Sequence, residues 1–183
     1  MGYGRDGGWH AMRARGFSLI EFVVVIIAVG IVTGFALDRL LPIIGRAERI
    51  AFVQVKSELQ SALLLEAAER IARGESNTLS TLNASNPMLL LFRPPANYLG
   101  AFPTQTAPAT EPASWHFDTS NNRLVYRIGR YAAFEALEGP ADRIELEVRF
   151  AFRDRDGDGQ YDPGSDSFDG LGLDSVYAYR WPD

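Results

Sequence analysis

The sequence has 183 residues, of which 46% are hydrophobic, so one modest domain with a real core and one appended segment can be expected. Its formal net charge of −5 argues against a general nucleic-acid-binding protein, whose surface is normally basic. The absence of cysteine excludes disulfides, thiol catalysis and cysteine-based zinc sites. The two histidines, His10 and His116, lie too far apart to indicate a metal motif, and no Gly-x-Ser-x-Gly elbow accompanies either of them. We therefore expect no enzyme.

The chain opens with a basic segment followed by an apolar run. Residues 1–16 are rich in glycine and contain three arginines and one acid. Residues 17–37 are apolar over about the ~20 residues that cross a bilayer, with Glu21 as the one charge. The preceding arginines predict that residues 1–16 stay in the cytoplasm while the C-terminal part crosses the membrane. We assign residues 17–41 to a transmembrane helix.

An amphipathic helix is expected next, over residues 42–75. Pro42 supplies no N–H group, so it should bend or briefly interrupt the helix. Beyond it, apolar residues recur at spacings of three and four, which indicates one buried stripe, and Gly74 is the expected C-cap. The stripe consists of Ile44, Ala47, Ala51, Val55, Leu59, Leu63, Ala67 and Ile71.

Residues 76–183 are expected to form a loop region and then an antiparallel sheet. Prolines and asparagines crowd residues 76–110, where the apolar run 88–92 should pack onto the domain. Strand-like runs follow, with a turn at Asn121 and Asn122 between the first two. These runs are residues 115–117, 123–128, 143–152 and 175–181. The sequence thus predicts an α+β fold in which a long N-terminal helix packs on a C-terminal antiparallel β-sheet.

The boundary between the basic segment and the apolar run carries a short motif. It reads Arg15-Gly16-Phe17-Ser18-Leu19-Ile20-Glu21. The motif resembles the class III signal of type IV pilins and pseudopilins. That resemblance implies a pilin-like fold, a leader peptide of residues 1–16, cleavage between Gly16 and Phe17 by a prepilin peptidase, and N-methylation of Phe17.

Glu21 has a physical reason to be in such a segment. An unpaired carboxylate inside a bilayer is costly and requires a partner. In the family that partner is the N-terminal ammonium of a neighbouring subunit, which here would be that of Phe17. The proline common in the family is absent, because Asp38 occupies its position and Pro42 lies four residues further on.

The resemblance also implies a role and a location. The chain would be a pseudopilin of a type II secretion system, acting in protein export across the outer membrane, or a minor pilin of a type IV pilus used in adhesion, motility or DNA uptake. Its partners would be the prepilin peptidase, other pilin or pseudopilin subunits and an inner-membrane assembly platform. It would span the bacterial inner membrane once, with a periplasmic C-terminal domain that assembles into a periplasmic or surface filament. A monomeric, membrane-anchored, calcium-dependent binding module is the alternative.

An acidic loop is expected at residues 154–166. Alternating carboxylates followed by a glycine reproduce much of an EF-hand calcium loop. The expected glutamate at the twelfth position is replaced by Ser165, so that Asp166, Asp169 or Asp174 would have to supply the bidentate ligand. A solvated acidic turn is the alternative, although mutual repulsion of the carboxylates favours a cation. The predicted calcium ligands are Asp154, Asp156, Asp158, Gln160, Asp162 and Asp166. The calcium site found in major pseudopilins implies a structural role for the ion.

Overall fold

A computed structural model describes residues 17–106 and 111–182. The chain divides into two compact units, Met1–Leu40 and Leu41–Asp183. Helix α1 (Leu19–Ala72) contributes residues to both.

In the first unit, the described residues from Leu19 onward are helical and mostly apolar. Every residue from Phe17 to Leu40 is exposed, and α1 begins at Leu19 with Glu21 in its first turn. By length and composition this part of α1 can cross a membrane, a property that it shares with signal sequences. The predicted long apolar helix is confirmed. The helix is also continuous through Pro42, so the expected interruption there is wrong.

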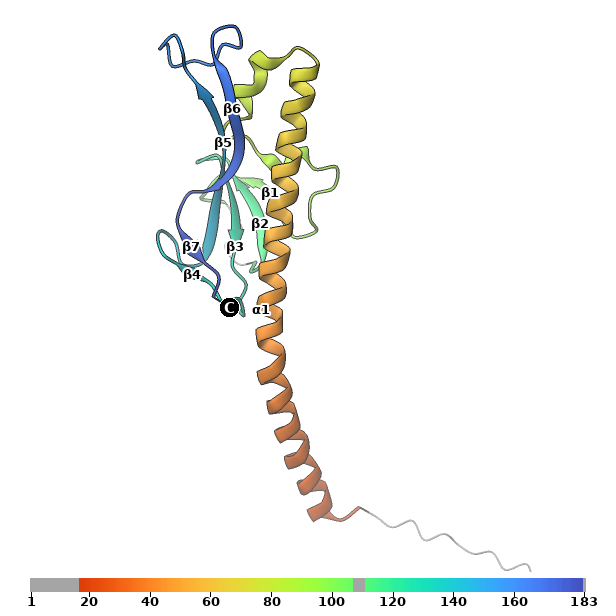
Figure 1. Ribbon diagram of the computed structural model, residues 1–183. Coiled ribbons are helices and arrows are strands. Elements are labelled where there is room, and N and C mark those ends of the chain that lie inside the picture. The colour runs from red at the N-terminus through yellow and green to blue at the C-terminus, as the bar shows by residue number, and fades with distance from the viewer. Residues whose placement is uncertain (1–16, 107–110, 183) are drawn as a thin grey trace, which may run out of the picture. The chain divides into compact units, whose positions relative to one another are not determined.

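In the second unit, α1 buries one face against a β-sheet (Figure 1). The side chains of Phe52, Leu59 and Leu63 are almost fully buried, and Gly45 and Ala67 lie on the same face. Residues 45, 52 and 59 are spaced seven residues apart. They lie on one face of the helix, because seven residues make almost two turns.

The predicted stripe is correct only in its middle. Residues 55, 59, 63 and 67 are buried or half-buried, whereas residues 44, 47, 51 and 71 are exposed. The predicted stripe advanced almost entirely in steps of four residues. Each such step exceeds a full turn by about 40°, so the stripe winds away from the sheet in both directions.

The end of α1 has the predicted cap. Gly74 has φ 75°, and its N–H donates to the carbonyl of Ile71 over 3.0 Å. The N–H of Glu75 donates to the carbonyl of Arg70 over 2.8 Å. These two bonds form a Schellman motif, which satisfies carbonyls at the helix end.

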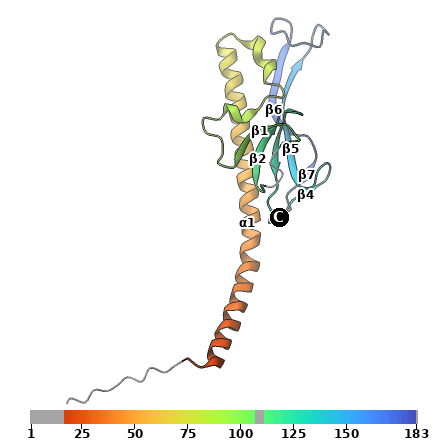
Figure 2. The ribbon, with the colours of Figure 1, turned by 180° about the vertical axis from the view of Figure 1, so that it is seen from behind.

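The main sheet has five strands in the order β1-β2-β3-β5-β6. Figure 2 shows the molecule from behind. It is mixed, because β1 pairs with β2 in parallel while the other neighbours are antiparallel. The expectation of a purely antiparallel sheet is therefore wrong at this pair. The strands are β1 (Tyr98–Phe102), β2 (Ser114–Asp118), β3 (Arg123–Arg127), β5 (Arg143–Arg153) and β6 (Ser167–Ser175), and a small second sheet pairs β4 (Glu135–Ala136) with β7 (Tyr179–Arg180).

Three of the four strand-like runs and the Asn121–Asn122 turn are confirmed in β2, β3 and β5. The fourth run, residues 175–181, is confirmed only in part, since it contains the short strand β7. The long strand of this region, β6, was not predicted and ends where that run was expected to begin. The region 76–110 holds two 3₁₀ helices, η1 (Ser76–Leu82) and η2 (Pro87–Leu90), as well as β1. Within the run 88–92, Met88 packs in the core as expected, but Leu89 and Phe92 are exposed.

Aromatic stacking forms the centre of the core. The rings of Phe52 on α1 and Trp115 on β2 are parallel within 4°, with centroids 5.3 Å apart. Tyr126 on β3 lies 4.7 Å from Trp115 between centroids. Offset stacked and tilted pairs of this kind add to the stabilisation that comes from burying the rings.

The backbone of α1 packs closely against the loop after β3. A Cβ atom added at Gly45 would clash with the backbone carbonyl of Tyr131. Glu48, one turn further along α1, accepts hydrogen bonds from the Tyr126 hydroxyl (3.0 Å) and the Gly129 N–H (2.7 Å). Burial, followed by the nearby Glu48 charge, raises the pKa of Tyr126. Glycine at position 45 therefore permits the contact that Glu48 secures.

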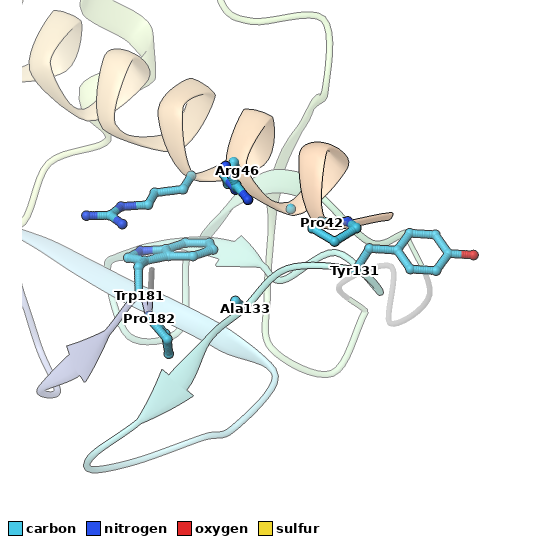
Figure 3. A pocket seen from close by; sticks show the side chains of 8 residues that line it. Pro42, Arg46, Tyr131, Ala133, Trp181 and Pro182 are labelled. Atoms are coloured by element: carbon cyan, nitrogen blue, oxygen red, sulfur yellow. The ribbon is translucent and has the colours of Figure 1, made fainter. Parts of the chain in front are cut away.

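A cavity of about 100 Å³ lies beside this contact. Figure 3 shows Pro42 on α1 next to the loop that carries Tyr131, with Trp181 on another side of the cavity. The cavity marks where the packing of α1 on the loop ends.

We expect Gly45→Ala to lower the free energy of unfolding by about 1–3 kcal/mol, because a methyl group forced against the Tyr131 backbone is overpacking. Chemical denaturation of the full chain in detergent, followed by tryptophan fluorescence, measures the change. Gly170→Ala is the control, since nothing lies within 4 Å of an added Cβ there. Equal stability of the two variants would contradict the close contact.

Candidate functional site

The N-terminal motif falls at the edge of the described residues. Gly16, the predicted residue before the cleaved bond, lies outside them. Phe17 is 72% exposed and precedes α1, and Glu21 is exposed in the first helical turn. Within the described ranges Glu21 has no ion pair. If this segment lies in a membrane, its carboxylate needs a partner from another molecule or from residues 1–16.

The part of α1 in the second unit also exposes large apolar side chains. Seven large side chains of this part are 47–66% exposed. They are Ile43, Ile44, Ile50, Val53, Leu64, Leu65 and Ile71. These side chains alternate along the helix with exposed polar residues such as Gln54 and Ser61, so they are available for contacts at several separate places. Sequence analysis assigned Ile44 and Ile71 to the core, but both are exposed in the structure.

The acidic loop joins β5 to β6 and has the predicted bounds, residues 154–166. Asp154 accepts hydrogen bonds from the N–H groups of Gly157 (2.6 Å) and Gly159 (2.9 Å). Hydrogen bonds from the Gly159 and Gly157 backbone lower the pKa of Asp154. Gly159 has φ 75°, a conformation that favours glycine. The loop thus curls around its first carboxylate.

Three of the six predicted calcium ligands come together. One carboxylate oxygen each of Asp154, Asp156 and Asp158 lie within 4.8 Å of one another, and all three residues are exposed. Calcium–oxygen distances are about 2.3–2.6 Å, so two oxygens on one ion are at most roughly 5 Å apart. The observed spacing therefore fits a single calcium ion, and it also fits an exposed acidic turn.

Asp162 and Asp166 lie in the same loop but outside this group. Asp166 is buried, and its two oxygens accept hydrogen bonds from the N–H groups of Arg155 (3.0 Å) and Asp162 (2.9 Å). It therefore closes the loop by joining its two ends. Gln160 donates its backbone N–H to Asp158 over 2.7 Å.

Asp169 and Asp174 are not brought to the group. Both lie on β6, where their carboxylates are 3.6 Å and 3.9 Å from the guanidinium groups of Arg153 and Arg149. Of the three alternatives for the missing twelfth-position ligand, Asp166 is the one that lies within the loop.

Aromatic residues that sequence analysis did not assign to this site lie near the loop. Tyr161 meets Phe150 and Phe152 edge-on, with centroids 5.0 Å and 5.6 Å apart, and Phe168 stacks on Phe150. The signal was available, because Phe150 and Phe152 continue the alternation of β5. This cluster gives the loop an apolar support.

His116 is the one histidine among the described residues. It is buried on β2, its Nδ1 has no hydrogen-bond partner in the described ranges, and burial lowers its pKa. On β5, Glu145 is buried and accepts hydrogen bonds from Arg123 (2.7 Å) and Arg143 (2.8 Å). The buried charge of Glu145 is thus paired with two partly exposed arginines.

No family model, curated protein or solved structure matches the chain. Function therefore has to be inferred from the residues and their geometry.

Proposed function

We propose that the chain is a structural subunit of a type IV pilin-like filament, a pseudopilin of a type II secretion system in the first place. The supporting observation is the continuity of α1, which is apolar and exposed over Leu19–Leu40 and then packs on the sheet of the second unit. Cleavage after the apolar run, as in a secretory signal, would cut this helix. Cleavage before Phe17 would leave it whole. A minor pilin of a type IV pilus has the same features.

Assembly would use the Glu21 carboxylate and the exposed apolar side chains of α1. The Glu21 carboxylate would pair with the Phe17 ammonium of a neighbouring subunit, which removes the cost of an isolated charge in the bilayer. The exposed apolar side chains of α1, among them Ile50 and Leu64, would pack against other subunits. The role is therefore mechanical, in the inner membrane and the periplasm, and the chain performs no chemistry itself.

We expect the mature chain to begin with N-methylated Phe17 in cells that contain a prepilin peptidase. In cells without the peptidase, residues 1–16 should remain attached. Mass spectrometry of the N-terminal peptide from membranes distinguishes the two forms. Attachment of residues 1–16 in both strains, or cleavage beyond residue 37, would refute the proposal.

We expect Glu21→Leu to be processed normally but to lose most of its incorporation into filaments, because the apolar side chain cannot pair with the ammonium group. Filaments sheared or released from cells and quantified by immunoblot provide the measurement. Asp38→Leu is the matched control, an exposed acid later on α1. If Glu21→Leu assembles as well as the control does, a monomeric membrane-anchored binding module becomes the better description.

We further propose that the loop 154–166 binds calcium. The spacing of the Asp154, Asp156 and Asp158 carboxylates supports this proposal. Gln160, Asp162 and Asp166 would complete the ligand set indicated by the sequence. The ion would neutralise the clustered charges and fix the ends of β5 and β6.

We expect calcium in place of EGTA to raise the melting temperature of the full chain. Calcium at about 100 times its dissociation constant would stabilise the folded state by roughly 2.7 kcal/mol. Asp156→Asn should reduce the shift, whereas Asp169→Asn, on β6, should keep it. A melting temperature that calcium leaves unchanged would identify the loop as a solvated acidic turn.

A further inference from the structure

Two large apolar side chains project from the segment around η2. Leu89 is 78% exposed and Phe92 is 95% exposed. The segment itself is anchored, because Pro87 and Met88 are buried and Asn86 accepts a hydrogen bond from the Met88 N–H over 3.1 Å. Phe92 is therefore exposed to solvent on a segment whose preceding residues are anchored in the core.

A positive charge accompanies this side chain. The guanidinium group of Arg93 lies 5.8 Å from the centre of the Phe92 ring, a cation–π contact. Among the described residues Arg93 takes part in no ion pair. The surface element formed by Phe92 and Arg93 is thus an exposed aromatic ring with an unneutralised cation beside it.

A cavity of about 300 Å³ opens on the second unit between α1 and the chain that follows Arg93, from which Pro95 and Asn97 line it. Phe52, Val55 and Trp115 contribute apolar lining, and Glu58 on α1 contributes a carboxylate. Glu58 accepts a hydrogen bond from the Gln54 amide over 3.2 Å, and it has no cationic partner in the part of the chain that the structure describes. The cavity therefore combines an apolar lining with an unneutralised acid.

We propose that Phe92 of one copy of this chain occupies the cavity of a second copy, where Arg93 pairs with Glu58. The aromatic ring matches the apolar lining, and the two unneutralised charges are opposite in sign. Phe92 does not occupy the cavity of its own chain, since it is 95% exposed. Phenylalanine and arginine are also enriched in protein interfaces relative to the rest of the protein surface.

This contact deepens the proposed function, on which it rests for the presence of neighbouring copies. The Phe92 element and the cavity are different surfaces, so the contact is heterologous. Each added copy then brings a new free Phe92 and a new free cavity. Contacts of this type build open assemblies when the rotation between copies does not close.

Photochemical cross-linking in membranes tests the contact directly. The photoreactive residue p-benzoylphenylalanine replaces Phe92 in the full chain and retains an aromatic ring. We expect a product of twice the chain mass, with the cross-link in the α1 peptide that contains Val55 and Glu58. The same residue in place of Tyr131, an exposed aromatic on another loop, should give no link to that peptide. A monomer alone, or a link to another protein, would overturn the inference.

Charge reversal tests the pairing. Arg93→Glu and Glu58→Arg should each lose most of the doubled product, because like charges then face each other, and the two changes together should restore it. Arg130→Glu, at another exposed arginine, is the control. Equal melting temperatures would establish that these surface variants fold. Failure of the double variant to recover the product would overturn the ion pair.

The outcome is separable from that of the filament proposal. Filaments that form equally well with Phe92→Ser would refute this contact and leave the filament subunit intact. A doubled product in membranes where the unaltered chain forms no filaments would support the contact and refute the filament.

Discussion

The fold of the second unit depends on how closely α1 can lie on the sheet. The absence of a side chain at Gly45 lets the helix touch the loop after β3, and Glu48 ties that loop and Tyr126 to the helix. Phe52 can then stack on Trp115. This rotational setting of α1 also decides which of its apolar residues are buried and which, such as Ile50, remain available to other molecules.

Features that depend on neighbouring residues were predictable from the sequence. The α1 helix, its Gly74 cap, the β2–β3 turn and the alternating strand β5 all follow from local periodicity or local conformation. The parallel pairing of β1 and the position of β6 did not follow, because each depends on a partner distant in sequence. In β6, Leu171 and Leu173 are buried against β5, but the glycines between and beside them concealed the strand.

In the acidic loop, too, some features were predictable from neighbouring residues and others were not. The gathering of Asp154, Asp156 and Asp158 was predictable, since alternating carboxylates before a glycine turn lie close together along the chain. The role of Asp166 in closing the loop was not, because it depends on the path between β5 and β6. The role of the N-terminal motif does not follow from the fold of one chain. Gly16 lies outside the described residues, and the proposed role of Glu21 requires a partner from another molecule.

The strand order leaves β6 with one neighbour in the main sheet, β5. A nine-residue strand of this kind offers unpaired backbone groups to any other chain that presents a strand, and this promotes edge-to-edge aggregation. Asp169 and Asp174 are exposed charges on that strand, and charged side chains on an edge strand disfavour such pairing. The same residues that do not join the acidic group thus disfavour strand addition at this edge of the sheet.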